Sequence, residues 1–146
     1  MGIEHYPRIA GVDEVGRGAL FGPVVAAAVI LSPVAANQLV KAGVKDSKQL
    51  RMQEREILYE VIKSHAIAFQ IGMASVREID RINILQASLL AMRRAIQRLS
   101  IQPELCFIDG NRPIPEFSIS QRTIIKGDQT EPAIAAASIL AKVWRD

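Results

Sequence analysis

Asp13 and Glu14 are adjacent acids that stand between apolar residues and a glycine-rich stretch in "AGVDEVGRGALFG". Asp109 in "FIDG" and Asp128 in "IKGDQ" also follow apolar runs and lie beside a glycine. Carboxylates that gather at one place repel one another unless a cation neutralises them, and hard oxygen ligands of this type select Mg²⁺ or Mn²⁺. The pattern suggests metal-dependent chemistry, whereas the plainer alternative is that Asp13 and Glu14 are exposed turn residues.

Runs of apolar and β-branched residues predict five strands that would position these acids. The predicted strands are 8–14, 23–31 ("PVVAAAVIL"), "AIAFQIGMAS", "ELCFIDG" and "SQRTIIKGD". Asp13 and Asp109 then lie at strand ends, where open α/β sheets place their ligand sites, and the two acids meet if their strands are neighbours. Asp128 repeats the order of strand, glycine and acid, so it is a candidate for the same edge.

Apolar residues at helical spacing predict three helices. The first covers about 50–64 with Ser47 as its cap, the second is capped by Asn83, and the last is "EPAIAAASILAKVWRD", with Pro132 in its first turn. The inward stripes are Ile57, Leu58, Val61 and Ile62 in the first helix, and Leu85, Leu89, Met92, Ile96 and Leu99 in the second. This order of strands and helices predicts an α/β fold with a mixed sheet.

Composition predicts a single soluble domain, 1–146, because Gly and Pro are scattered singly and no repeat or linker occurs. No stretch has the length and hydropathy of a membrane span or a signal peptide, so we expect a cytoplasmic protein without a membrane partner. The lone Cys106 cannot form a disulfide or a thiolate metal site within one chain. A formal net charge of +3 permits a polyanionic partner without requiring one.

Glycines and cations supply candidates for binding a phosphate-containing partner. The backbone amides of Gly16, Arg17 and Gly18 can approach a substrate closely, and Arg17 adds a guanidinium. The candidates outside this loop are Lys48, Lys126, Ser138, Lys142 and Arg145. Ser138 and Lys142 lie one helical turn apart, which also fits the solvated edge of a buried helix. The lysines have an ordinary alternative as surface charge.

Several other chemistries have no support in the sequence. The glycines of "GRGALFG" miss the dinucleotide spacing by one residue and precede a predicted strand, where that motif needs a helix. His5 and His65 lie far apart without ligand spacing, which disfavours a zinc site or a two-histidine mechanism. Ser47 and Ser138 lack a recognisable base partner, which disfavours a covalent serine mechanism.

The chain resembles the bacterial type 2 ribonucleases H, the ribonuclease HII family. The matching motifs run in family order from Gly11 to the last residue: "GVDEVGRGALFGPVVAAAVIL", "VKDSKQL", "INILQASLLAM", "FIDGNRPIP" and "KGDQTEPAIAAASILAKVWRD". The resemblance implies an RNase H-like fold with a central mixed five-stranded sheet flanked by helices. It also implies a monomer that acts in ribonucleotide excision repair, on RNA/DNA hybrids or duplex DNA containing ribonucleotides. The implied reaction is two-metal hydrolysis on the 5′ side of a ribonucleotide, leaving a 3′-hydroxyl and a 5′-phosphate.

The resemblance also implies roles for individual residues. The metal-binding acids are Asp13, Glu14 and Asp109, the fourth acid is Asp128, with Asp146 as the alternative, and the cofactor is Mn²⁺ or Mg²⁺. Gly16, Arg17 and Gly18 match the motif that contacts the 2′-hydroxyl through the backbone. The residues that match phosphate-binding positions are Lys48, Ser138 and Lys142.

The resemblance finally implies that the chain is truncated at its C-terminus. Family members continue past the position of Asp146 through helices that carry a tyrosine packed on the sugar beside the cleavage point, and neither Tyr6 nor Tyr59 takes its place. Two alternatives to an active ribonuclease H stay open. One is an inactive nucleic-acid-binding fragment of the same fold, and the other is a nuclease of that fold that acts on DNA alone.

Overall fold

The computed structural model describes residues 7–16 and 22–146, and a five-stranded sheet forms its centre. The strands are β1 (Ile9–Val15), β2 (Val24–Ile30), β3 (Ala68–Ala74), β4 (Leu105–Asp109) and β5 (Ser120–Ile124). Their order in the sheet is β3-β2-β1-β4-β5, in which β2 is antiparallel to β1 and β3, and β4 is parallel to β1 and β5. The mixed five-stranded sheet predicted from the sequence is confirmed.

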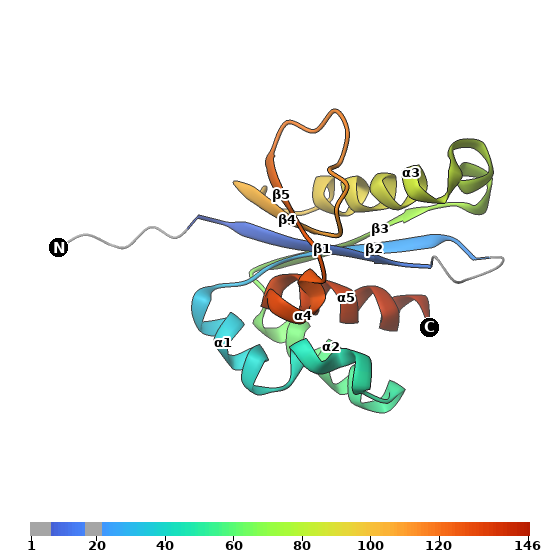
Figure 1. Ribbon diagram of the computed structural model, residues 1–146. Helices are drawn as coiled ribbons and strands as arrows, with labels where there is room; N and C mark the ends of the chain where they lie inside the picture. The colour runs from blue at the N-terminus through green and yellow to red at the C-terminus, as the bar shows by residue number, and fades with distance from the viewer. Residues whose placement is uncertain (1–6, 17–21) are drawn as a thin grey trace.

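Helices cover both faces of this sheet (Figure 1). They are α1 (Pro33–Lys41), the 3₁₀ helix η1 (Val44–Gln49), α2 (Met52–His65), α3 (Val76–Gln97), α4 (Gly127–Thr130) and α5 (Pro132–Arg145). Helix α3 lies alone on one face, and the other helices lie on the opposite face (Figure 1). Among the helices of the described residues, none combines the length and the apolar character needed to cross a membrane.

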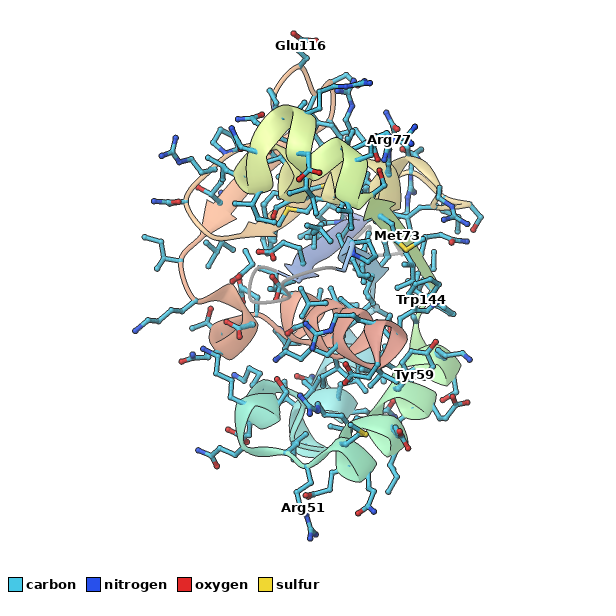
Figure 2. All side chains as sticks on the ribbon, turned by 90° about the vertical axis from the view of Figure 1, so that its right-hand side faces the viewer. Arg51, Tyr59, Met73, Arg77, Glu116 and Trp144 are labelled. Carbon is cyan, nitrogen blue, oxygen red and sulfur yellow. The ribbon has the colours of Figure 1, made fainter. Side chains whose placement is uncertain are left out.

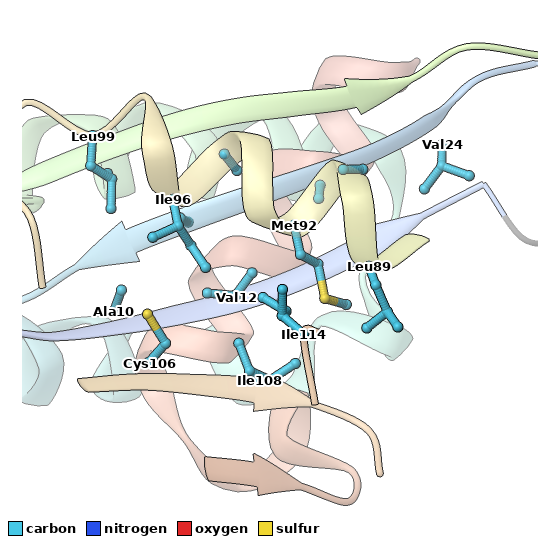
Figure 3. Close-up of a cluster of buried hydrophobic side chains, with 14 of the residues drawn as sticks. Ala10, Val12, Val24, Leu89, Met92, Ile96, Leu99, Cys106, Ile108 and Ile114 are labelled. Carbon is cyan, nitrogen blue, oxygen red and sulfur yellow. The ribbon is translucent and has the colours of Figure 1, made fainter. Parts of the chain in front are cut away.

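The face under α3 holds one of two apolar cores (Figure 3). The predicted stripe of α3 supplies Leu89, Met92 and Ile96, which pack over β1 and β4. From the strands, Val12 and Ile108 point into this core, as does Cys106. Burial raises the pKa of the Cys106 thiol to about 12, so this residue behaves as a small apolar side chain.

The opposite face is covered mainly by α5, whose residues from Ile134 to Ala141 are all buried. Gly11 of β1 permits this close packing, because a Cβ there would collide with the backbone of Ala133 and Ile134. All of β2 is buried because helices lie on both of its faces, which explains its continuous apolar sequence.

Apolar side chains near the C-terminal end of α5 are exposed. Trp144 keeps 46% of its surface in solvent. Figure 2 shows Met73, Trp144 and Tyr59 following one another along one side of the molecule, from β3 past the end of α5 to α2. The burial of α5 is therefore complete against the sheet and ends at its last turn.

Two expectations about the first predicted helix are wrong. Ser47 does not cap it, because Ser47 lies inside η1, and α2 begins at Met52 after Arg51, whose backbone N–H donates to the carboxylate of Glu54. Ile57 is also not part of the buried stripe, since 66% of its surface is exposed. Leu58 and Ile62 are the buried residues of this helix, which packs against α5.

Helix α1 was not predicted, although its start has a recognisable sequence signal. Ser32 caps it through a hydrogen bond of 3.1 Å from the backbone N–H of Ala35 to its hydroxyl oxygen, and Pro33 occupies the first turn. Only two residues of α1 are buried, Ala35 and Leu39. Such a short apolar stripe gives a weak periodic pattern, which is why the sequence did not reveal the helix.

Asn83 caps a helical segment as predicted, but a second segment precedes it. Helix α3 starts at Val76, where Ser75 and Glu78 form a reciprocal capping box. At Asn83 the backbone adopts a left-handed φ of 73°, and its side-chain oxygen accepts a hydrogen bond of 3.0 Å from the N–H of Gln86. The long predicted helix is therefore the second part of α3, after a kink.

Candidate active site

Asp13 and Asp109 lie at the same edge of the sheet. Strands β1 and β4 are parallel neighbours, and their register pairs Val12 with Ile108, the residues that directly precede the two acids. Each strand therefore places a carboxylate at its C-terminal end. The sequence analysis expected the two acids to meet if their strands are neighbours, and β1 and β4 are neighbours. Asp13 is only 5% exposed, and the charge of Asp109 acts on it directly.

Asp128 reaches the same place from α4. Its backbone N–H donates a hydrogen bond of 3.3 Å to Oδ1 of Asp109, and its side chain is almost fully buried. The turn into α4 is made by Lys126 in the left-handed conformation, with a φ of 55°, followed by the buried Gly127. A Cβ at Gly127 would lie 2.5 Å from Cδ1 of Ile134, so glycine lets this turn pack closely against the start of α5.

Glu14 and Asp13 lie on opposite faces of β1. Val12 belongs to the core under α3 and Val15 packs on the core under α5, so alternation along the strand puts Glu14 on the α3 side and Asp13 on the α5 side. Glu14 accordingly lines a cavity with residues of α3, and that cavity also reaches Asp109. The acids thus surround the end of β1 from both sides of the sheet.

Burial and repulsion make Asp13 costly to ionise. Its pKa is raised well above the usual value, first by desolvation, then by the negative charges of Asp109 and Glu14, and to a smaller extent by Asp128. The backbone N–H of Glu14 donates to Oδ1 of Asp13 at 2.8 Å and opposes this rise. Asp146, the alternative fourth acid, follows α5 and forms an ion pair of 3.3 Å with Arg145.

The acids fit a hard divalent cation by their chemistry. A buried carboxylate beside three others is a site at which added positive charge is stabilising, and carboxylate oxygens are the ligands of Mg²⁺ and Mn²⁺. In residues 7–16 and 22–146, however, no three His, Cys, Asp or Glu side chains are already arranged as a ligand set.

The structure brings only some of the predicted phosphate-binding residues toward the acids. Lys48 of η1 lies 3.9 Å from Oδ2 of Asp128, measured from its Nζ, and remains largely exposed. Ser138 is buried on α5, and Lys142 follows one turn later, half-buried. Gly16 directly follows β1 with a φ of 128°. Arg17 and Gly18 lie outside the described residues.

Sequence reasoning did not assign Asn111 and Arg112, which line the cavity beside Glu14 and Asp109 together with Ser88 of α3. The signal was present, because "DGNR" places a glycine turn and two polar side chains directly after the acid at the end of β4. A larger cavity, of about 530 Å³, lies elsewhere, at the other end of β1 beside Ile9, and its lining is mainly apolar. It does not contact any of the acids.

Comparison with known proteins identifies the family to which the chain belongs. The sequence profile described as Ribonuclease HII matches residues 10–146, a range that includes all four acids. The chain belongs to the ribonuclease HII family. The ribonuclease HII of Acaryochloris marina is 66% identical over 139 residues, which cover 95% of this chain and 70% of that protein. The first four such relatives are matched over 61–70% of their lengths.

Solved structures agree with membership of the ribonuclease HII family. The crystal structure of ribonuclease H2 from Pyrococcus horikoshii OT3 superposes with a TM-score of 0.84 at 28% identity, covering 95% of this chain and 72% of that one. Bst-RNase HIII in complex with Mn²⁺ has a TM-score of 0.78 at 22% identity, over 95% of this chain and 52% of that one, and shows a shared fold. The RNase H-like fold implied by the sequence resemblance is confirmed.

Proposed function

We propose that this chain supplies the catalytic domain of a metal-dependent endoribonuclease. It hydrolyses the RNA strand of RNA/DNA hybrids and cuts on the 5′ side of single ribonucleotides in duplex DNA, leaving a 3′-hydroxyl and a 5′-phosphate. The observation that supports this most is the convergence of Asp13, Asp109 and Asp128, from two parallel strands and α4, within the family's matched range. As the resemblance implies, the activity would serve the removal of ribonucleotides from DNA in the cytoplasm.

The carboxylates would hold Mn²⁺ or Mg²⁺. Asp13, Asp109 and Asp128 would bind from the α5 side of the sheet and Glu14 from the other side. Divalent ions bound there supply an activated water and stabilise the charge that develops on the leaving oxygen. The Mn²⁺ complex of the structurally similar Bst-RNase HIII supports the choice of cation.

The remaining site residues would position the nucleic acid. Lys48 contributes positive charge beside Asp128, and Ser138 and Lys142 follow one another along α5, so we assign these three to backbone phosphates. Gly16 to Gly18 would contact the 2′-hydroxyl through backbone groups, which distinguishes RNA from DNA. The 2′-hydroxyl then serves recognition, and the two histidines, His5 and His65, take no part in the chemistry.

A cleavage assay tests this proposal. The chain is incubated with an RNA/DNA hybrid, with a DNA duplex that contains one ribonucleotide, and with an all-DNA duplex, each with and without Mn²⁺. We expect cleavage of the first two substrates only, only with the cation, and with 5′-phosphate products. Cleavage of the all-DNA duplex at a similar rate would instead show a nuclease that acts on DNA generally.

One observation favours a second candidate function, that of a non-catalytic nucleic-acid-binding fragment. The chain matches 61–70% of the lengths of its first four relatives, so residues needed for catalysis in those proteins can lie beyond the matched part. Binding of the hybrid with no cleavage under any cation would identify this function. A control is the same assay with the full-length relative from Acaryochloris marina, which should cleave in parallel.

A further inference from the structure

A small cavity of about 90 Å³ lies beside the acids on the α3 face of the sheet. Its polar lining consists of Glu14, Ser88, Asp109, Asn111 and Arg112. The hydroxyl of Ser88 is already used within α3, where it donates a hydrogen bond of 2.9 Å to the carbonyl oxygen of Ile84. Asn111 and Arg112 are exposed and stand at the outer side of the cavity. The candidate acids and a guanidinium thus share one small space.

The loop that carries Arg112 is fixed at both of its ends. Gly110 has a φ of 112° and turns the chain directly after Asp109. Four residues later Ile114 is buried in the core under α3. The side-chain amide of Gln121 holds Ile114 from both sides, accepting from its N–H at 2.8 Å and donating to its carbonyl oxygen at 2.9 Å. The backbone that carries Arg112 is therefore held between the end of β4 and the core under α3.

Arg112 is free to bind an anion. In the described residues it has neither an ion pair nor a side-chain hydrogen bond, whereas Arg94 is paired with Glu78 and Lys48 lies beside Asp128. A guanidinium offers several donors in a planar fork that matches the oxygens of a phosphate. The neighbouring side-chain amide of Asn111 adds two further donors.

The position of Arg112 complements that of Lys48. Lys48 lies beside Asp128, which belongs to the α5 side of the acids, and Arg112 lies beside Glu14 on the α3 side. We propose that Arg112, assisted by Asn111, binds a phosphate of the substrate strand next to the cleaved bond. The strand then crosses the edge of the sheet, with one phosphate contact on each side of the acids. This inference rests on the proposed function and adds to it a positioning residue.

Substrate binding by Arg112→Ala tests the proposal, with Arg112→Lys and Arg81→Ala as companions. Arg81 is an exposed arginine on the first segment of α3 and serves as the matched control. We expect Arg112→Ala to raise KM for an RNA/DNA hybrid about tenfold with a smaller change in kcat. The slope of log Kd against log salt should fall by about 0.7–0.9, the value for one lost phosphate contact. Arg112→Lys should keep the slope and lose part of the affinity.

Single neutral methylphosphonates along the substrate strand locate the contact. In the wild type, neutralising the phosphate bound by Arg112 should weaken binding, and in Arg112→Ala the same replacement should have no further effect. Equal salt slopes for Arg112→Ala and Arg81→Ala, or additive effects at every methylphosphonate, would overturn the inference while leaving the nuclease proposal intact. Failure of the wild type to bind or cleave any hybrid would overturn the proposed function, and this inference with it.

Discussion

The backbone N–H of Asp128 donates a hydrogen bond of 3.3 Å to Oδ1 of Asp109. This contact joins α4 to the end of β4 across 19 residues of sequence and places both acids beside Asp13. Because the donor is a backbone group, the position of Asp128 is set by the fold of the turn at Lys126 and Gly127. The acid cluster is consequently a property of the packed sheet edge and of the turn that leads into α4.

Asp13→Asn should abolish cleavage while keeping the fold. The substitution removes a charged metal ligand, and we expect activity to fall at least about 100-fold, more than is usual for residues that only support ligands. Removing a buried, repelled carboxylate should also raise the melting temperature in the absence of divalent cations. Cleavage rates and thermal unfolding check both effects, with the exposed Asp80→Asn on α3 as control. Wild-type cleavage by Asp13→Asn would contradict its role.

Gly11→Ala should be among the most destabilising single changes in the chain. Its Cβ would meet the backbone of α5, which cannot move without separating the helix from the sheet, and we expect a loss of about 3 kcal/mol or more. Gly43→Ala is the comparison, since Gly43 has a φ of 93° but open space around it, and strain alone should cost about 1–2 kcal/mol. Urea unfolding measures both. Equal losses would show that the packing of α5 on β1 is looser than described.

The ion pair between Glu78 and Arg94 should make stability depend on acid pH. Hydrogen bonds from Arg94, the shortest at 2.6 Å, and from the N–H of Ser75 lower the pKa of Glu78 from 4.5 to about 2. A lowered folded-state pKa means that the stabilisation is complete above pH 4.5 and is lost as the pH falls through about 2. The difference in free energy of unfolding between wild type and Glu78→Gln should therefore shrink across this window.

The control for this pH dependence is Glu56→Gln, an exposed acid of α2 without an ion pair among the described residues. Its difference from the wild type should stay nearly constant over the same range. Chemical unfolding at several pH values between 5 and 2 gives both series. A Glu78→Gln difference that does not change with pH would mean that the pair with Arg94 contributes no proton-linked stability.

The sequence predicted the elements whose signals are local and strong. The continuous apolar run of β2, the periodic stripe of α3 after Asn83 and the Pro132 start of α5 all mark elements that the structure contains. Prediction from the sequence failed where tertiary packing decides the local structure. Ser47 has the chemistry of a helix cap, but it is buried inside η1, which packs against α5. No local pattern specifies that outcome.

In the candidate site, too, the sequence predicted the features that have a local signal and missed those that depend on tertiary packing. The order of strand, glycine and acid pointed to Asp13, Asp109 and Asp128, because strand ends at one edge are a consequence of sheet topology. The opposite orientations of Asp13 and Glu14 follow from strand alternation, but the cavity that Glu14 shares with Arg112 does not. That cavity depends on where α3 and the loop anchored by Ile114 lie, which is settled only in three dimensions.

Mn²⁺ binding tests most directly whether Asp13 and Asp109 share a divalent cation. Isothermal titration calorimetry would compare the wild-type chain with Asp13→Asn and Asp109→Asn, using Asp80→Asn as the control. We predict that the wild type and the control bind Mn²⁺ alike, and that each site variant loses most of the affinity because either carboxylate alone is insufficient. Undiminished Mn²⁺ binding by both site variants would contradict the account.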